Sequence, residues 1–368
     1  MRNKIITLFF CLLLAIGVLS GLLVPDKYYS ESEKRTLTQK SAISVSDFAS
    51  GKMSNEIENY LSDQFPLRDS WITVKTVAEL LSGKTEISNV YFGKDNYLLD
   101  KFASYDRSQF TVNIDALVKL SESLKASDIP MQVMLIPTAV QILSAKLPAC
   151  APNLNQRALL DYANTQGLNT VNVFDILLQH NNEYIYYKTD HHFTSLGAYY
   201  CYVALMLAQG KTPEPLSAWQ SQILCTDFRG TTYNKVNYPF AAYDTITAYY
   251  KTLSHTVSYN SDNYITDSIY ERKYLSGKDQ YATFLNSNQS TTVVTGNGTG
   301  SLLILKDSYA NCFAQFVIDD YAETHLIDLR FFKDNLSDYI AENNITEVLV
   351  LYNIPNFTSD TAISKTLN

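Results

Sequence analysis

Basic residues are scarce in this chain of 368 residues, and their scarcity excludes one large class of partner. The chain has 29 lysines and arginines against 37 aspartates and glutamates, which gives a net charge of −8 at neutral pH. Binding to nucleic acid requires a basic face, because much of the affinity comes from releasing counterions from the phosphate backbone. The sequence therefore argues against a nucleic-acid partner, and a polyanionic substrate would need a local cluster of cations.

Glycine and cysteine are also uncommon. Only 13 glycines accompany 46% apolar residues, so the chain is globular rather than disordered and is large enough for one big domain or two smaller ones. The five cysteines show no spacing typical of a metal site. Cys150, Cys201, Cys225 and Cys312 permit two disulfides in three pairings. Because Cys201 and Cys312 lie in apolar helical patterns, we expect these two to be buried free thiols.

The N-terminal segment lacks the cleavage site that a secretory leader carries. Arg2 and Lys4 precede an apolar run of 20 residues, Ile5–Val24, which is long enough to span a bilayer. The positive flank favours a cytoplasmic N-terminus, which would place everything after Pro25 outside the cytoplasm. No small-x-small site precedes Pro25, so we predict an uncleaved single-pass membrane anchor at residues 1–24, with a cleaved signal peptide as the alternative.

The remainder of the chain falls into three kinds of pattern. Residues 25–89 are polar and then amphipathic, which predicts a stalk followed by surface helices. Residues 90–218 and 295–368 alternate between helical and strand patterns, as in an α/β fold with a doubly wound, mostly parallel sheet. The expected strands are at 131–136, 171–174, 302–305, 325–329 and 347–352, and the expected helices are near 112–126, 156–166, 195–209 and 334–342. Residues 219–294, rich in Tyr, Thr, Asn and Ser, predict a β-rich insertion.

A short segment before the helix at 195–209 carries the residues with the clearest chemical meaning. Asp190 and His192 are two residues apart, so on an extended segment their side chains leave the same face while His191 points away. A histidine oriented by a carboxylate is the usual general base of acyl-transfer sites. We therefore predict His192 as the base, Asp190 as its orienting partner, and His191 as a residue of the pocket wall.

The matching nucleophile is expected at Ser308. An apolar run that predicts a buried strand stops just before it, and a helical pattern begins just after it. A hydroxyl at such a strand-to-helix corner lies beside free helical amides, as a nucleophilic serine requires. The alternative is an ordinary N-cap, which contributes about 1 kcal/mol. A metal site of Asp190, His191 and His192 is the chemical competitor, but no second histidine cluster completes it, so no metal or cofactor is expected.

These motifs are similar to those of a known family. Asp190-His191-His192-Phe193 resembles the motif that names the bacterial DHHW proteins, with phenylalanine in place of tryptophan. Those proteins are similar to the alginate O-acetyltransferase family, and the likeness extends through Gln64–Asp69, Tyr91–Asp95, Leu135–Pro137 and Lys306–Asn311. The resemblance implies an SGNH-hydrolase-like fold in permuted order, in which the Asp-x-His pair precedes the serine. It also supports catalytic roles for Asp190, His192 and Ser308.

An acyl-transfer site also needs donors for the developing oxyanion and groups that bind substrate. The Ser308 amide is the first candidate donor. Asn353 is the second, because it follows a predicted strand and would lie at the carboxyl edge of the sheet, although it is equally typical of a turn. Tyr309, His191, Lys188 and Arg330 are the candidate substrate-binding residues.

The sequence and the resemblance together predict a membrane-anchored O-acetyltransferase outside the cytoplasm. Its expected substrate is a cell-surface polysaccharide, and its expected route is an acyl-serine intermediate. The resemblance also implies a membrane-bound O-acyltransferase partner that supplies the acyl group across the bilayer. A carbohydrate O-acetylesterase with the same residues is the first alternative. The second is a carbohydrate-binding or scaffolding module without turnover, because folds persist while sites change.

Overall fold

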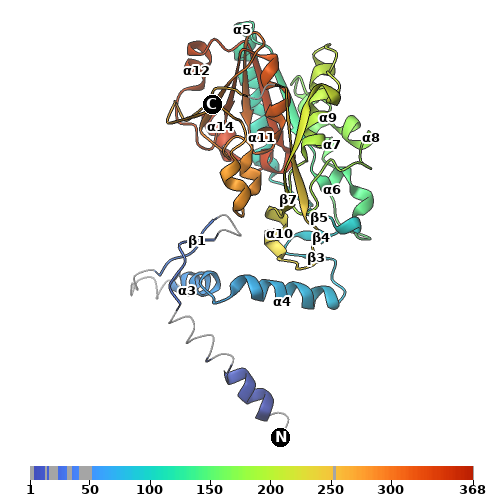
Figure 1. Cartoon of the computed structure of the whole chain (residues 1–368), viewed down its shortest axis with the longest axis vertical. Helices are drawn as coiled ribbons and strands as arrows, with labels where there is room; N and C mark the ends of the chain where they lie inside the picture. Colours follow the sequence, from blue (N-terminus) through green and yellow to red (C-terminus); the bar gives the residue numbers. More distant parts are fainter. Residues whose placement is uncertain are drawn as a thin grey trace. The chain divides into compact units, whose positions relative to one another are not determined.

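The computed structural model describes residues 4–12, 15, 24–30, 35–40, 52–251 and 254–367. The chain divides into two compact units, which can be followed by their colours in Figure 1. The N-terminal unit comprises Met1–Ser88 and Tyr233–Phe240, and the sheet unit comprises Asn89–Thr232 and Ala241–Asn368.

The N-terminal unit is built on two helices, α3 (Lys52–Asp63) and α4 (Arg68–Leu81), which confirm the expected surface helices. Two short strands precede them, the antiparallel pair β1 (Tyr29–Ser30) and β2 (Arg35–Thr36), and β3 (Glu86–Ile87) follows. Thr38 fastens the early segment to α3, because its amide and hydroxyl both donate to the Asp63 carboxylate at 2.8 and 2.9 Å.

Most of the predicted membrane anchor lies outside the described residues. Residues 4–12 are helical, and the run up to Val24 is otherwise described only at residue 15. Within the described parts of the chain, no helix has both the length and the apolar character needed to cross a membrane. The anchor therefore stays a prediction.

The sheet unit is organised around a seven-stranded mixed sheet in the order β10-β9-β11-β13-β12-β14-β6. Strands β13, β12, β14 and β6 are parallel neighbours, whereas β11, β9 and β10 continue the sheet in antiparallel pairing. The bounds are β6 (Met131–Ile136), β9 (Val257–Tyr259), β10 (Tyr264–Thr266), β11 (Thr291–Thr295), β12 (Ser301–Lys306), β13 (Glu323–Ile327) and β14 (Glu347–Asn353). Strand β6 is buried at every position, as expected of a parallel strand covered on both faces.

Helices cover the sheet on both sides. In Figure 1, α8 and α9 pack together on one side, and α5 and α14 pack together on the other. The helices of the sheet unit are α5 (Arg107–Ala126), α6 (Ala139–Ile142), α7 (Arg157–Thr165), α8 (Phe174–Gln179), α9 (Ser195–Ala208), α11 (Tyr309–Phe313), α12 (Leu336–Glu342), α13 (Ile354–Phe357) and α14 (Thr361–Leu367); α10 (Thr231–Val236) spans both units. The α/β prediction and the long helices are confirmed. Thr194 caps α9, since its hydroxyl accepts from the Gly197 amide at 3.3 Å.

Two expectations about strands need correction. The strand predicted at 171–174 is only a parallel bridge between Thr170 and Val133, because the chain turns at once into α8. The region 219–294 is β-rich as predicted, but β9, β10 and β11 extend the central sheet, and Tyr233–Phe240 belongs to the N-terminal unit. The exposed edge of a parallel sheet needs backbone partners, and these antiparallel strands supply them.

The rest of that region forms hairpins and short turns beside the sheet. Strands β7 (Gln220–Phe228) and β8 (Asp244–Tyr250) pair in antiparallel fashion with two register shifts. Earlier in the chain, β4 (Val90–Phe92) and β5 (Leu98–Asp100) form a further antiparallel hairpin. All five cysteines are free thiols, and Cys201 and Cys312 are buried as predicted. Burial raises the pKa of the Cys312 thiol to about 12, so it stays protonated.

Candidate active site

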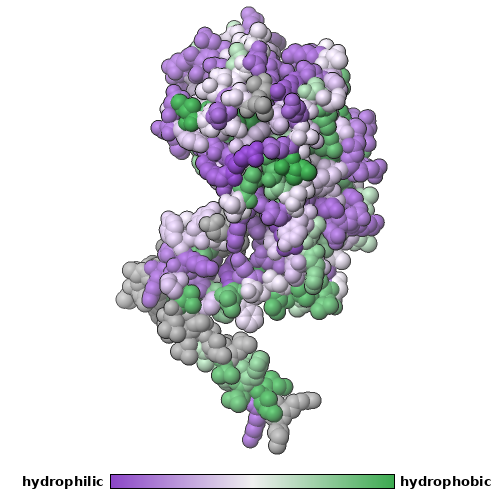
Figure 2. Space-filling view, viewed as in Figure 1, coloured by the Kyte–Doolittle hydropathy of each residue, from purple (hydrophilic) through white to green (hydrophobic). Residues whose placement is uncertain are grey.

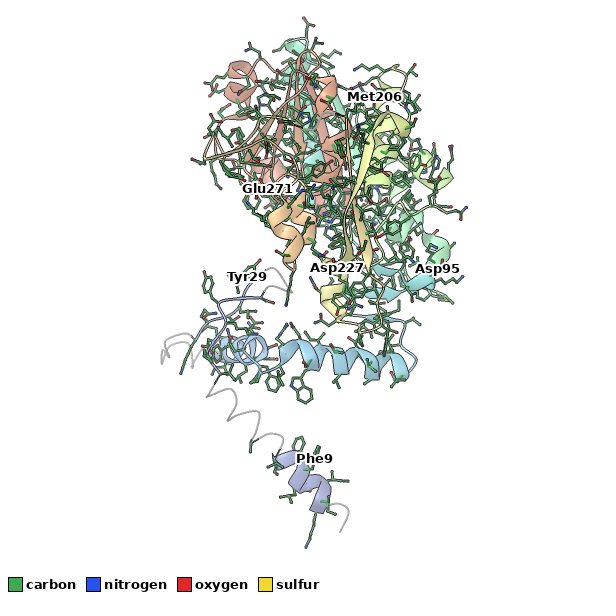
Figure 3. The ribbon with its side chains drawn as sticks, in the orientation of Figure 1. Phe9, Tyr29, Asp95, Met206, Asp227 and Glu271 are labelled. Carbon is green, nitrogen blue, oxygen red and sulfur yellow. The ribbon has the colours of Figure 1, made fainter. Side chains whose placement is uncertain are left out.

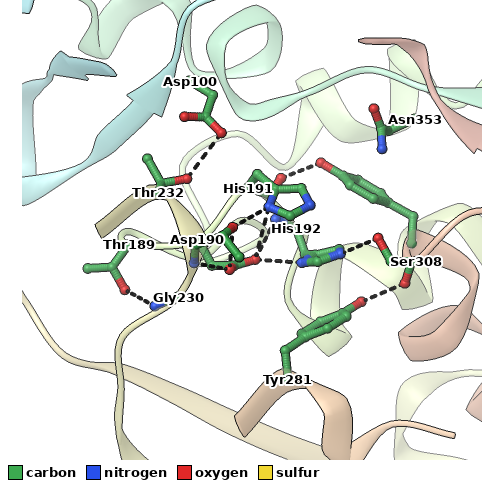
Figure 4. A network of polar contacts seen from close by, with 12 residues as sticks. Asp100, Thr189, Asp190, His191, His192, Gly230, Thr232, Tyr281, Ser308 and Asn353 are labelled. Carbon is green, nitrogen blue, oxygen red and sulfur yellow. Dashed lines mark hydrogen bonds and ion pairs between the residues drawn. The ribbon is translucent and has the colours of Figure 1, made fainter. Parts of the chain in front are cut away.

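Ser308 lies at the corner between β12 and α11, at the carboxyl edge of the sheet. Its side chain makes no capping bond to the helix, which removes the ordinary N-cap as the explanation for this serine. Its hydroxyl instead lies 2.7 Å from Nε2 of His192, a residue 116 positions away in the sequence (Figure 4). No hydrogen bond from the Ser308 amide to another described residue is present, so this donor can serve a ligand.

The imidazole of His192 is held between the serine and a carboxylate. Its Nδ1 lies 2.5 Å from Oδ1 of Asp190, and its backbone amide donates to the same oxygen at 2.9 Å. A neutral ring with its proton on Nδ1 leaves Nε2 free to accept the proton of Ser308. The structure thus brings the three predicted catalytic residues into one hydrogen-bonded line.

The second oxygen of Asp190 is held by residues that the sequence patterns did not single out. Oδ2 accepts from the amide of Thr231 at 2.7 Å and from its hydroxyl at 3.0 Å. The backbone at Gly230 approaches so closely that a Cβ there would lie 2.1 Å from Oδ2. The carboxylate is therefore fully used as an acceptor, and only glycine permits this packing.

The loop that carries the Asp-x-His pair is fixed by Asp244, the first residue of β8. Its carboxylate accepts from the amide of Lys188 at 2.8 Å and from the amide and hydroxyl of Thr189 at 2.8 and 2.6 Å. Burial raises the pKa of the Asp244 carboxyl, and these donors oppose the rise. Asp244 has no sequence motif around it, so only the fold reveals its role in orienting the loop.

Tyr281 covers the open face of His192. The two rings are stacked, with centroids 3.7 Å apart and planes inclined by 10°. The Tyr281 hydroxyl donates to the backbone carbonyl of Ser308 at 3.2 Å. Burial raises the pKa of this hydroxyl well above its ordinary value, so it remains a donor. Tyr281 lies in the short 3₁₀ turn Gln280–Thr283, within the region 219–294.

Asn353 does not join the serine and histidine. Its side-chain amide donates to Oδ2 of Asp307 at 2.6 Å, and its backbone amide donates to the same oxygen at 2.9 Å. Its own oxygen caps α13 by accepting from the Asn356 amide at 3.0 Å. Figure 4 accordingly draws no contact from Asn353 to Ser308. The predicted oxyanion role is corrected: Asn353 supports the buried Asp307 beneath the Ser308 corner.

Of the four predicted substrate-binding residues, Lys188 and Arg330 line cavities, whereas Tyr309 and His191 contact the loop beside the Asp-x-His pair. Tyr309 is fully buried and its hydroxyl donates to the backbone carbonyl of His191, so it supports the site without meeting substrate. His191 is partly exposed, with Nδ1 2.5 Å from the Thr231 hydroxyl, and its place in a pocket wall stays a prediction. Lys188 and Arg330 line cavities and are described next.

Lys188 faces a cavity of about 450 Å³ next to the catalytic loop. Its ammonium group lies over the ring of Tyr97 at 5.6 Å from the centroid. The cavity is also lined by Tyr184 and Tyr243, and by Asp95, which is exposed in Figure 3 and paired with Lys146 at 2.5 Å. Aromatic faces beside charged groups suit the apolar faces and hydroxyls of a sugar.

Arg330 faces a second cavity, of about 590 Å³, together with Lys333 and Lys365. Its guanidinium forms a two-pronged ion pair with Asp328 at 2.8 and 2.5 Å, so much of its charge is already balanced. Behind it lies Lys306, whose ammonium is 3.0 Å from Oδ1 of Asn288. Burial lowers the pKa of Lys306 to about 8, because a low-dielectric site disfavours its charged form.

Asp190, His191 and His192 lie close enough together to hold a metal ion, but their hydrogen bonds oppose metal binding. Ligand atoms of Asp190, His191 and His192 lie within 4.8 Å of one another. However, both Asp190 oxygens and the two ring nitrogens of His192 are already committed within the line to Ser308 and to Thr231. A metal ion would have to break this line, so the residues fit proton transfer better than metal binding.

A serine, a histidine and a buried aspartate thus form one line at the carboxyl edge of the sheet of an α/β protein, which makes this a candidate serine-nucleophile site. Residues 82–327 match the DHHW protein family, and the chain belongs to it. The matched segment contains all three residues and ends before Asn353. No curated protein matches the chain.

Solved structures share this fold. A DHHW family protein from Eubacterium siraeum is 24% identical with a TM-score of 0.65, over 76% of this chain and 95% of that chain. PatB1 of Bacillus cereus is 20% identical with a TM-score of 0.63, over 74% and 97%. The O-acetyltransferase domain of Pseudomonas putida AlgJ is 12% identical with a TM-score of 0.50, over 76% and 98%. The expected fold is confirmed in its coarse form, an α/β fold with a mixed, mostly parallel sheet.

Proposed function

We propose that this protein is an extracytoplasmic O-acetyltransferase that acetylates a cell-surface polysaccharide through an acyl-serine. The single observation that carries the proposal is the line from Asp190 through His192 to the Ser308 hydroxyl, at 2.5 and 2.7 Å. The shared fold with a protein described as an O-acetyltransferase domain supports the acyl group and the transfer reaction.

In the first half of the reaction, His192 Nε2 takes the proton of the Ser308 hydroxyl as Oγ attacks the acyl carbonyl of the donor. The Ser308 amide is placed to stabilise the oxyanion of the tetrahedral intermediate. Collapse of the intermediate breaks the bond to the leaving group, which receives the proton from His192, and leaves an ester on Ser308. Asp190 holds the imidazole in the correct tautomer and stabilises its charged form.

In the second half, His192 removes the proton of a sugar hydroxyl, whose oxygen attacks the ester on Ser308. The Ser308–acyl bond breaks, the sugar leaves as an O-acetyl ester, and the proton returns to Oγ. Water in place of the sugar would give hydrolysis, so transfer requires a bound sugar that excludes water. The cavity beside Lys188, with its three tyrosines, is where we place the acceptor.

The N-terminal apolar run would anchor the protein in the cell membrane with the sheet unit outside the cytoplasm. This location suits a cell-surface acceptor. It also calls for a membrane-bound O-acyltransferase partner that brings the acyl group across the bilayer, because acyl donors are made in the cytoplasm.

The deciding experiment incubates the purified full chain with a small activated acetyl ester, with and without a cell-wall glycan fraction. We expect ester cleavage, acetylated glycan in the presence of acceptor, and loss of both by several orders of magnitude in Ser308→Ala. Thermal unfolding should be unchanged in that variant, since Ser308 makes no capping bond. Free acetate without acetylated glycan would establish an esterase. Equal absence of turnover in both proteins, with retained glycan binding, would establish a binding module.

A further inference from the structure

Helix α4 of the N-terminal unit presents an apolar stripe to the outside. Leu67, at its start, and Trp71, Val74, Ala78 and Leu81 follow one another at spacings of four and three residues, which places them on one helical face. Their side chains are exposed: 76% for Leu67, 45% for Trp71, 58% for Val74 and 84% for Leu81. Figure 2 shows hydrophobic residues gathered along this helix. An apolar patch of this length calls for a partner.

The stripe is not the face by which α4 packs within its own unit. The hydroxyls of Thr73 and Thr76, which project from the opposite face, donate to the backbone carbonyls of Asn237 and Val236 at 3.1 and 2.6 Å. Thr76 is buried by this contact. The segment Tyr233–Phe240 therefore covers one face of the helix, while the side chains of the apolar face are exposed.

The chain that leaves the N-terminal apolar run is fastened close to this stripe. Asp26, two residues after the end of Ile5–Val24, accepts from the Tyr60 hydroxyl at 2.9 and 3.0 Å. Lys27 is held by Gln64, whose side chain accepts from the Lys27 amide and donates to its carbonyl, both at 2.9 Å. Gln64 directly follows α3 and directly precedes the link to α4.

The residue types at the link between α3 and α4 are those found at membrane surfaces. The Phe65 and Trp71 rings meet edge to face with centroids 6.2 Å apart, and both are exposed. Tryptophan, phenylalanine and leucine on one helical face are typical of helices that lie in the headgroup layer. Leu67 adopts φ 56°, a left-handed conformation that asparagine or glycine would adopt at less cost. An exposed leucine in this conformation is expected where its side chain contacts something other than the protein itself.

From these observations we propose that the α4 stripe lies in the interfacial layer of a phospholipid bilayer. The apolar run at Ile5–Val24 would end at the same surface, because Asp26 and Lys27 tie its exit to the end of α3. Acidic and basic side chains are nearly balanced along α4, so the attraction rests on apolar burial rather than on anionic lipid. This interaction goes beyond the proposed acetyl transfer and does not depend on turnover.

The two tryptophans of the chain provide the test. Trp71 lies on the stripe, whereas Trp219 is 6% exposed in the sheet unit. The full chain is reconstituted in phosphatidylcholine vesicles, and quenching is measured with phosphatidylcholine brominated in the upper acyl chain. In Trp219→Phe, which reports Trp71 alone, we expect emission to be roughly halved by brominated lipid and little affected by aqueous iodide. Trp71→Phe, which reports Trp219 alone, should respond to neither quencher.

A matched variant isolates the stripe from the anchor. Leu67→Asn suits the left-handed backbone and should keep the fold, while reducing the lipid quenching of Trp71. It should leave cleavage of a small acetyl ester unchanged, since Leu67 is not part of the site. Strong quenching of Trp71 by iodide would overturn the proposal. So would protection from both quenchers, which would mean that protein covers the stripe, or failure of the chain to float with vesicles.

Discussion

The ring of Tyr281 lies parallel to the imidazole of His192, with centroids 3.7 Å apart and planes inclined by 10°. The same tyrosine bonds the Ser308 carbonyl through its hydroxyl, so one side chain touches both the base and the residue that carries the nucleophile. A stacked ring restricts rotation of the imidazole, and its electron-rich face favours the charged form that arises when His192 takes a proton. Tyr281 is therefore a positioning residue in the proposed mechanism.

Replacing Tyr281 by leucine should lower kcat/KM for a small acetyl ester by ~10-fold to ~100-fold, because the imidazole loses its stacked support. The acid limb of the pH–rate profile should move to lower pH, since the charged imidazole loses the aromatic face. Tyr281→Phe keeps the ring and should retain most of the activity. A leucine variant with an unshifted acid limb and full activity would show that the stacking has no role.

Gly230→Ala should inactivate the protein, because the added Cβ would lie 2.1 Å from the Asp190 carboxylate and would displace it from His192. We expect activity to fall by ~100-fold or more. Gly277→Ala is the control, since its Cβ would meet nothing closer than 3.5 Å. Steady-state kinetics and thermal unfolding of both variants give the comparison. Equal activity in the two alanine variants would contradict the assigned packing.

Removal of metal ions should leave activity unchanged within ~2-fold, because proton transfer between the Ser308 hydroxyl and His192 needs no Lewis acid. The measurement is cleavage of a small acetyl ester after dialysis against a chelator. Added Zn²⁺ should inhibit, since it would compete for His192 Nε2. Loss of activity on dialysis that is restored by a metal ion would instead support a metal site at Asp190, His191 and His192.

Stability should depend on pH through Lys306. Burial lowers its pKa to about 8 in the folded chain, against an ordinary value of 10.5. Between these two values the unfolded chain binds the proton and the folded chain does not, so stability rises as pH increases across this window. The contribution approaches about 1.4 kcal/mol per pH unit for one proton.

The Lys306 contribution is the difference between the wild-type protein and Lys306→Met in chemical denaturation at several pH values. From pH 8 upward, the free energy of unfolding of the wild-type protein should rise relative to that of Lys306→Met. Below pH 8 the folded chain carries the full penalty for burying the charged ammonium group. The exposed Lys333→Met serves as control for other titrating groups. If the free energy of unfolding depends on pH in the same way for all three proteins, burial does not disfavour the charged form of Lys306.

The sequence predicted the parts of the fold that depend on local pattern. Strands β6, β12 and β14 are continuous apolar runs, and α9 is an apolar helix with a threonine cap, so period, length and capping were sufficient. In the region 219–294 the sequence predicts β structure but not the place of β9, β10 and β11 in the central sheet, because these strands are short and are positioned only by pairing with β13 and with one another.

The sequence by itself determined the family and the three reactive residue types, because the Asp-x-His pair and the Ser308 corner are local motifs. Only the tertiary structure decided which side chains support them. Thr231, Asp244 and Tyr281 have no distinguishing neighbours in the sequence, and their roles arise when distant loops meet at the carboxyl edge of the sheet. Asn353 shows the converse, since the sequence predicts its position at a strand end, but the buried carboxyl group of Asp307 decides what its amide binds.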